Sequence, residues 1–181
     1  MFDGDPSAHF VAQYPVDVVK FNGGSDAASF LNTLRYVSQR QAQWDPSDIV
    51  YFTEDDFWHK EDWPTIMREG FHNARADIIS LYDHRDKYTG ALRPCEVTCT
   101  DSCHWRSAVS TVNTFALRYG CLMEDMDVYK DFANPAVSRV CVDHERFLRL
   151  YESKGRRLFT CIPARSTHCE REHLSPVVPW P

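Results

Sequence analysis

The sequence predicts a single α/β domain in which a mixed, mostly parallel, Rossmann-like sheet is flanked by helices. Short apolar runs typical of buried strands alternate along the chain with stretches of helical periodicity, and this alternation is the pattern of βαβ units. The chain has 181 residues, which is long enough for one domain with a substantial core. No repeat or linker interrupts it, so we expect one domain over residues 1–181.

The composition limits the class of protein. Hydrophobic residues make up 43% of the chain and charged residues 25%, as in soluble globular proteins. The formal net charge of -6 argues against a broad nucleic-acid-binding face, which needs clustered Lys and Arg. No apolar run is long enough for a transmembrane segment, and the first residues lack the basic start and apolar stretch of a secretory signal. A cytoplasmic location is therefore expected.

The first elements are short. Residues 2–6 look like the end of a strand that runs into a turn, and residues 16–21 form a strand candidate. A Gly-containing turn follows, and Ser25 or Asp26 then caps a helix with one apolar stripe.

A run of strand-forming residues at 47–52 leads into three consecutive acids, Glu54, Asp55 and Asp56. Three adjacent carboxylates repel one another, and this repulsion opposes their ionisation. A divalent cation relieves it, because hard cations take oxygen ligands, and ligands of open α/β sheets collect at the carboxyl ends of strands. The triplet therefore indicates a metal-assisted phosphate site. The alternative is a solvated acidic turn in which Asp55 or Asp56 caps the next helix.

The remaining elements continue the alternation. We expect strands at 76–83, 96–100, 112–117 and 158–162, helices beginning near 62 and covering 122–132 and 143–153, and an extended Pro-rich tail at 174–181 anchored by Trp180. Gly155 is expected to end the last helix. Asp143 and His144 open that helix, where Asp143 also suits an N-cap, and His168 follows the last core strand.

Two further groups of residues have a chemical and a structural interpretation. In His104-Trp105-Arg106 the arginine suits a phosphate or a sugar hydroxyl and the tryptophan a sugar face, whereas a packed Trp with two exposed neighbours is the plain alternative. Cys95, Cys99 and Cys103 with His104 offer zinc ligands, although their spacing differs from the usual paired two-residue gap.

The order of these parts resembles the nucleotide-sugar glycosyltransferases of the GT-A fold, in particular the family-two-like group. The resemblance rests on the acidic triplet after a buried strand, on Asp143-His144 at a helix start, and on His168 after the last strand. It covers most of the chain from Asp17 onward. The strand that begins the fold in that family has no counterpart, so the chain looks N-terminally shortened.

The resemblance implies a hexosyltransferase-like enzyme, inverting at the anomeric carbon, with a nucleotide-sugar donor and a carbohydrate or glycoconjugate acceptor. It implies a divalent metal, Mn²⁺ or Mg²⁺, held by Asp56 and His168, with Glu54 and Asp55 directed toward metal or donor ribose. Asp3 matches an acid that contacts the nucleotide base.

The other site residues follow less closely from the family pattern. The catalytic base corresponds to Asp143 or His144, where the family has an acidic pair, and Asp125 is a third candidate for the base. Arg106 has no strict counterpart and would contact acceptor or phosphate. A truncated inactive relative and a zinc-stabilised binding module remain the alternatives.

Overall fold

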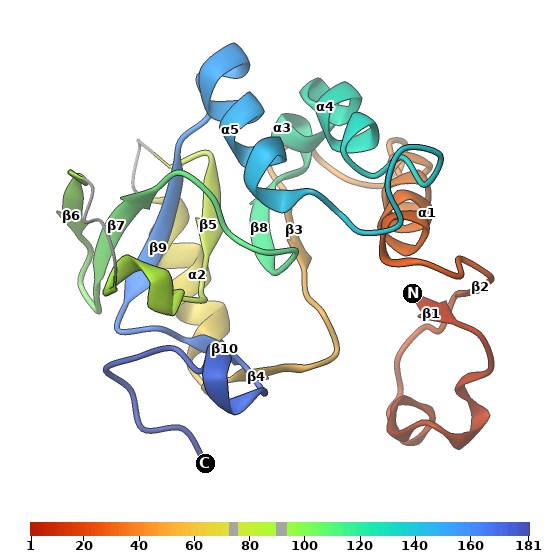
Figure 1. Cartoon of the computed structure of the whole chain (residues 1–181), viewed down its shortest axis with the longest axis horizontal. Coiled ribbons are helices and arrows are strands. Elements are labelled where there is room, and N and C mark those ends of the chain that lie inside the picture. Colours follow the sequence, from red (N-terminus) through yellow and green to blue (C-terminus); the bar gives the residue numbers. More distant parts are fainter. Residues whose placement is uncertain (73–75, 90–93) are drawn as a thin grey trace.

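The computed structural model describes residues 1–72, 76–89 and 94–181 and shows a mixed α/β fold (Figure 1). Its centre is a six-stranded sheet with the order β3-β8-β5-β9-β7-β6. The strands are β3 (Ile49–Phe52), β8 (Phe115–Arg118), β5 (Ile78–Ser80), β9 (Leu158–Ile162), β7 (His104–Ala108) and β6 (Val97–Cys99).

The expectation of a mostly parallel sheet is wrong. Within the six-stranded sheet, β5 and β9 pair in parallel, and the other four neighbouring pairs in the described residues are antiparallel. β3, β5 and β9 do run in one direction, as a βαβ pattern requires, but β8 comes from later in the chain and inserts antiparallel between β3 and β5. β6 and β7 add a hairpin at the far edge.

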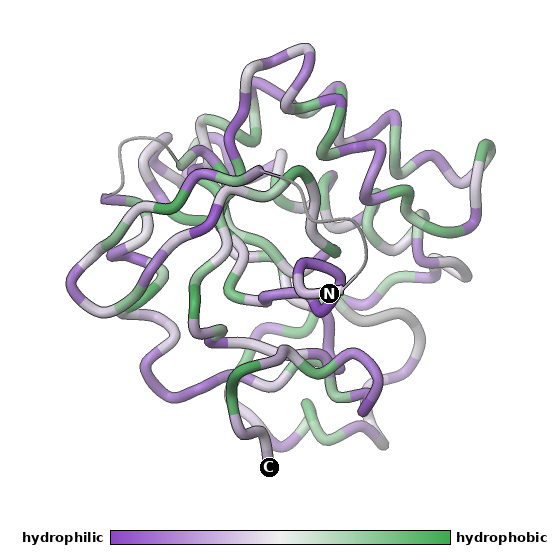
Figure 2. Tube along the Cα trace, turned by 60° about the vertical axis from the view of Figure 1, so that its left-hand side comes forward, coloured by the Kyte–Doolittle hydropathy of each residue, from purple (hydrophilic) through white to green (hydrophobic). Residues whose placement is uncertain are grey.

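Each face of the sheet is covered by its own helices. α1 (Asp26–Ser38), α3 (Tyr119–Glu124), α4 (Met126–Asp131) and α5 (Asp143–Lys154) pack on one face, and α2 (Trp63–Phe71) packs on the other (Figure 1). Because side chains alternate along a strand, Ile78 and Ile79 enter opposite cores. Apolar segments accordingly follow the interior strands, and hydrophilic segments dominate the periphery (Figure 2).

Local sequence signals set several boundaries correctly. Ser25 caps α1, since its hydroxyl accepts a hydrogen bond from the Ala28 N–H at 3.3 Å. Gly155 ends α5 with a φ of 69°, a left-handed conformation that glycine adopts without a steric penalty. The helix expected over 122–132 is instead two helices that meet at Asp125, whose buried carboxylate binds the Arg156 guanidinium at 2.7 Å.

Short elements outside the large sheet were harder to foresee. β4 (Phe57–His59) pairs antiparallel with β10 (Ser166–His168), and neither strand was expected. Near the N-terminus, β1 (Phe2–Asp3) pairs in parallel with β2 (Lys20–Phe21), so the strand expected at 16–21 is reduced to its last two residues. Short 3-10 helices complete the fold as η1 (Pro6–Ala8), η2 (Phe10–Gln13), η3 (Arg85–Lys87) and η4 (Arg171–His173).

The tail after η4 folds back on the body of the protein. The Trp180 indole N–H donates to the Ser175 carbonyl at 2.9 Å, and the Lys60 ammonium lies 4.6 Å from the Trp180 ring. Trp180 thus anchors the tail, as the sequence indicated. None of the helices in the described ranges combines the length and apolar character needed to span a bilayer.

The packing of α2 on β7 gives a first prediction, because a Cβ atom at Gly70 would lie 2.5 Å from the Trp105 ring. On helix propensity alone, Gly70→Ala should stabilise the protein. We expect it instead to lower the free energy of unfolding by about 1–3 kcal/mol, the usual cost of overpacking. Urea unfolding measures the change, with the exposed α2 substitution Thr65→Ala as a control that stays near wild type. A stabilised Gly70→Ala variant would contradict this packing.

Candidate functional site

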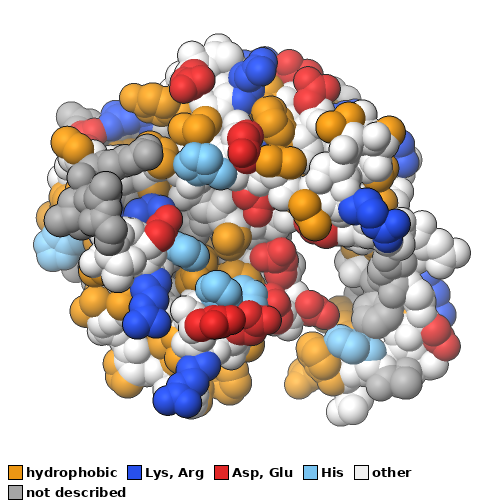
Figure 3. All heavy atoms as spheres, in the orientation of Figure 1, with side chains coloured by type: hydrophobic (Ala, Val, Ile, Leu, Met, Phe, Trp, Pro, Cys, Tyr) orange, Lys and Arg blue, Asp and Glu red, His pale blue; other side chains and the backbone are white. Residues whose placement is uncertain are grey.

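A cavity of about 670 Å³ lies beside the carboxyl end of β3. Its walls come from the N-terminal segment, from α1 and from the residues that follow β3, and four of the lining side chains are acidic: Asp26, Glu54, Asp55 and Asp56. The space-filling view shows acidic and histidine side chains gathered on this face, next to the hollow between the body and the N-terminal segment (Figure 3). We call this space the acidic cavity.

Two predicted metal ligands meet at the side of this cavity. Asp56 Oδ2 lies 3.1 Å from His168 Nε2, although the two residues are far apart in the sequence. The β4–β10 pairing brings them together, and the Cys169 N–H donates to the Asp56 carbonyl at 2.8 Å next to the pair. The sequence placed Asp56 after β3 and His168 after β9, which are not neighbours in the large sheet. The two residues meet instead through the separate β4–β10 pair.

The other ring nitrogen of His168 determines where its proton lies. His168 Nδ1 accepts a hydrogen bond from the Glu170 N–H at 3.1 Å, so a neutral His168 ring carries its proton on Nε2 and donates it to Asp56. If Nε2 binds a metal, Nδ1 takes the ring proton and the Glu170 N–H must turn away. Binding of a metal by His168 Nε2 and the hydrogen bond from the Glu170 N–H to His168 Nδ1 therefore exclude each other.

Glu54 is the most electrostatically perturbed member of the triplet. Its backbone N–H donates to the Thr114 hydroxyl at 3.3 Å, which ties the end of β3 to the segment before β8. The pKa of the Glu54 carboxyl is raised to about 7, first because surrounding protein displaces water and second because negative Asp56, Asp143 and Asp26 oppose its ionisation. The residue nevertheless keeps solvent access, so it can exchange protons or meet a ligand.

Asp143 lies at the start of α5 and is held by Arg146 one turn later. Arg146 Nη2 lies 2.9 Å from Asp143 Oδ1, and the arginine side chain has no exposed surface. Burial raises the pKa of Asp143 to about 6, against the opposing effect of the Arg146 charge. Oδ1 is buried against the guanidinium, whereas the side chain as a whole is 23% exposed, so Oδ2 is the oxygen that a ligand can reach.

The neighbouring His144 has different surroundings. Its Nδ1 lies 2.9 Å from the Ser110 hydroxyl, and it lines a second cavity that shares no lining residue with the acidic cavity. Arg106 lines this second cavity too and pairs with buried Asp83. The structure thus separates His144 and Arg106 from the acidic triplet.

The sequence hypotheses for Asp125 and Trp105 have clear structural outcomes, whereas the one for Asp3 is not tested. Asp125 is 1% exposed and bound to Arg156 at the junction of α3 and α4, which makes it a structural ion pair and removes it as a candidate base. Asp3 belongs to β1, but its side chain lies outside the described part of the structure. Trp105 has no exposed surface, so the packed interpretation of this residue is the correct one.

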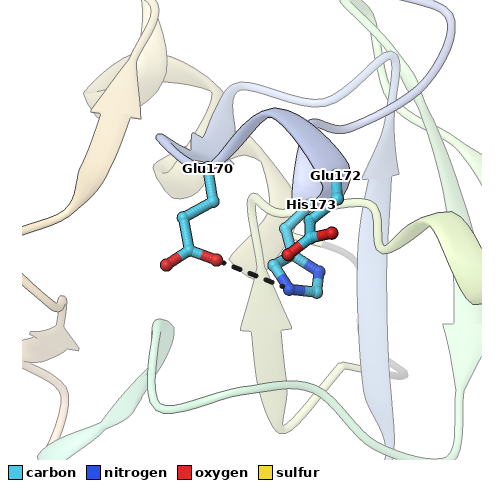
Figure 4. Close-up of side chains that lie close together, drawn as sticks. All are labelled: Glu170, Glu172 and His173. Atoms are coloured by element: carbon cyan, nitrogen blue, oxygen red, sulfur yellow. Dashed lines mark ion pairs between the residues drawn. The ribbon is translucent and has the colours of Figure 1, made fainter.

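The cysteine hypothesis requires four ligand atoms close together. Over residues 1–72, 76–89 and 94–181, the group of three or more potential metal ligands with atoms within 4.8 Å of one another is Glu170, Glu172 and His173, not the cysteines. Figure 4 shows these three side chains on η4, where Glu170 Oε2 lies 3.6 Å from His173 Nε2. The His173 ring is 5.4 Å from the His168 ring, so this exposed group borders the Asp56–His168 pair.

Sequence reasoning missed several residues that shape the site. Asp26 was read as a possible helix cap, but it lines the acidic cavity and accepts the Cys141 N–H at 2.6 Å. Arg146 was assigned no role from the sequence, where its signal is the i,i+3 spacing from Asp143. Glu170, Glu172 and His173 could have been found from their close spacing after His168.

Asp56 and His168 are the pair of predicted ligands that the structure brings together, and a carboxylate oxygen with an imidazole nitrogen is a combination that suits Mn²⁺. Glu54 lines the same cavity as Asp56, but the described residues do not gather its carboxylate with this pair into a group of three ligand atoms within 4.8 Å. Burial is the largest cause of the raised pKa of Glu54, and the negative charges of Asp56, Asp143 and Asp26 are the part that a cation would relieve. A metal at Asp56 and His168 therefore stays a prediction, with two candidate ligands in contact.

Comparisons with known protein families and with curated protein sequences gave no match to this chain.

The electrostatics of the triplet give a second prediction. In Asp56→Asn, loss of one negative charge should lower the pKa of Glu54, because Asp56 is the largest charge that raises it. Asp55→Asn is the matched control, since Asp55 is not among the principal causes of the Glu54 shift and should change it less. Carbon-13 NMR titration of the Glu54 carboxyl measures both variants. Equal shifts in both variants, or none in either, would contradict the arrangement described.

Proposed function

We propose that this protein is a metal-dependent glycosyltransferase that moves a sugar from a nucleoside-diphosphate donor to an acceptor hydroxyl. One observation carries the proposal: Asp56 and His168, from strand ends more than a hundred positions apart, lie 3.1 Å from each other beside a cavity with four acidic side chains. Diphosphate is anionic, so a cavity of this charge accepts it only together with a cation. The resemblance of the sequence motifs to GT-A enzymes agrees with this chemistry.

The acidic triplet and His168 hold the metal in this proposal. Asp56 and His168 are the principal ligands, and Glu54 and Asp55 face the metal or the donor ribose. A bound Mn²⁺ or Mg²⁺ supplies positive charge against the negative charge that develops on the leaving diphosphate. The volume of about 670 Å³ is within the range of small-molecule sites, so the cavity has room for a nucleotide.

Asp143 is the base that we assign to the acceptor hydroxyl. Its pKa of about 6 lets the carboxylate form predominate at neutral pH while keeping it more basic than an ordinary aspartate. The Arg146 guanidinium fixes Oδ1 and leaves Oδ2 to take the proton. Direct attack by the hydroxyl opposite the leaving diphosphate inverts the anomeric carbon. His144, the second candidate base, lies next to it on the side of the second cavity.

The third prediction tests donor and metal binding. Thermal melts with Mn²⁺ and UDP-, GDP-, CMP- or dTDP-sugars should show a rise in Tm with one donor class. For this chain length a ligand at a hundred times its Kd adds roughly 5–10 °C. The rise should require Mn²⁺ and disappear in Asp56→Ala, but persist in Asp131→Asn, which changes an exposed aspartate at the end of α4.

The outcome that counts against the proposal is equally specific. A cooperatively folded wild-type protein whose Tm is unchanged by every donor with Mn²⁺ would remove the active-enzyme interpretation and favour an inactive relative.

The fourth prediction concerns the base. Asp143→Asn removes the proton acceptor but keeps a side chain of the same size, so the transfer rate should fall by about 10²-fold or more. Donor binding by the same variant should stay close to wild type, because Asp143 is not a metal ligand in this proposal. Donor turnover measured beside the thermal melt separates the two effects. If Asp143→Asn turns over donor at the wild-type rate, Asp143 is not the catalytic base, and His144 becomes the candidate.

A further inference from the structure

The large sheet has an open edge at β3. This strand is the last in the order β3-β8-β5-β9-β7-β6, and within the described residues it pairs with β8 alone. The Tyr119 N–H donates to the Asp48 carbonyl at 2.8 Å, and hydrogen-bonded positions alternate along an antiparallel pair. Every second residue of β3, beginning with Val50, therefore turns its backbone groups toward β8, whereas Ile49 and Tyr51 turn theirs toward the open edge.

A groove of about 430 Å³ follows this open edge. Its walls are β3 itself, the side chains of Thr33, Tyr36 and Val37 from α1, and the indole of Trp44. β3 has four residues and spans about 13 Å at about 3.3 Å per residue, so an extended segment of similar length can lie along it. We call this space the β3 groove.

The β3 groove is continuous with the acidic cavity. Both spaces are lined by Met1, Thr33, Tyr51 and Phe52. Met1 lies next to β1, which pairs with β2 alone in the described part of the chain, and in Figure 1 β1 lies on the side of β2 that is turned toward the large sheet. Two open strand edges therefore border one space, and a strand laid along β3 would lie between the two sheets.

The surroundings of β3 determine the side chains that such a strand needs. Val50 and Phe52 belong to the larger hydrophobic core, on the side of α1, whereas Ile49 and Tyr51 pack on the core at α2. Because side chains alternate between the two faces of a sheet, an added strand extends both layers. It therefore needs apolar side chains on both faces, as interior strands have.

The charges at the two ends of β3 favour a basic partner over a second copy of this chain. Asp48 precedes the strand, and Glu54, Asp55 and Asp56 follow it. Two copies that paired through β3 would place acid against acid, since an antiparallel pair brings Asp48 beside the triplet and a parallel pair brings the two triplets together. No Lys or Arg from the described ranges lines the acidic cavity. A segment with Lys or Arg at this end complements the triplet.

We propose that the open edge of β3 binds an extended segment of a separate polypeptide, which adds to the large sheet as a further strand. The segment has apolar side chains on both faces and a Lys or Arg beside Glu54, Asp55 and Asp56. Main-chain hydrogen bonds to Ile49 and Tyr51 supply affinity, and the side chains supply specificity. The inference does not rest on the proposed function, because it uses backbone groups of β3 and neither a metal nor the base.

The experiment is amide hydrogen exchange of the full chain, followed by NMR without metal or nucleotide, in the presence of the peptide acetyl-Lys-Val-Ile-Val-Ile-Lys-amide. A lysine at each end lets the peptide bind in either direction. The amides of Ile49 and Tyr51 should exchange about a hundredfold more slowly at a peptide concentration of a hundred times Kd. The amides of Val50 and Phe52, which β8 already protects, should exchange slowly with and without peptide.

Two control peptides and two variants separate strand addition from other binding. Glu in place of both Lys should weaken binding by about tenfold or more, because it places acids beside the triplet. Pro in place of both Ile removes N–H donors that a strand needs and should abolish protection. Thr33→Trp fills the β3 groove and should block the peptide, whereas Asn32→Trp changes a neighbour on α1 that lines neither space. Thermal melts verify that both variants fold.

Several results would overturn the proposal. These are no protection of Ile49 and Tyr51 by the Lys peptide, equal protection by the Glu or Pro peptide, and equal effects of Thr33→Trp and Asn32→Trp. Protection that rises with protein concentration in the absence of peptide would also overturn it, because a second copy would then occupy the edge. The donor melts test the metal site separately, so failure of one experiment leaves the other proposal standing.

Discussion

The guanidinium of Arg146 is a positive charge with no exposed surface, placed inside the larger of the two hydrophobic cores. Four aromatic rings surround it, and those of Phe30 and Phe147 lie 4.8 Å from its central carbon. Its Nη2 binds Asn113 Oδ1 and Asp143 Oδ1, each at 2.9 Å. Removing one partner of such a buried pair typically costs about 3–5 kcal/mol. α1, α5 and the link before β8 are therefore held to one cation.

That cation also organises the electrostatics of the site. Its charge opposes the burial effect that raises the pKa of Asp143, and it partly offsets the acids that raise the pKa of Glu54. A positive charge with no exposed surface thus moderates the ionisation of two acids near the cavity. His144, which follows Asp143 on the same helix, lines the second cavity and not the acidic one.

The sequence was most informative where local chemistry decides the structure. The strand at 158–162, the Ser25 cap and the Gly155 terminus follow from side-chain periodicity and backbone preference, and all three are present as expected. Strand order was not predictable in this way. β8 enters antiparallel between β3 and β5 through long-range packing, so the predicted common direction holds for β3, β5 and β9 but the predicted neighbours do not.

The candidate site also divides into features that local sequence predicts and features that depend on long-range packing. The acids after β3 and His168 were recognisable as ligand types, and their meeting depends on the three-residue strands β4 and β10, which are too short for a periodicity signal. The burial of Arg146 was hidden because arginine on a helix is usually a solvent-exposed residue. His144 and Arg106 were expected near the triplet, and their separation from it arises from the path of the β7–β8 link, which residue types do not reveal.

The topology of the sheet also affects the order in which the protein can fold. β3 pairs with β8, more than sixty positions later, and β4 pairs with β10, which lies near the end of the chain. Such non-local pairings must close long loops before they gain stability, so they slow folding. A ribosome-bound chain that has emerged only as far as α2 would have neither partner strand. The acidic cavity needs Asn113 from the link before β8, so its walls come together only after the residues between β3 and that link have been made, and β3 is unpaired until then.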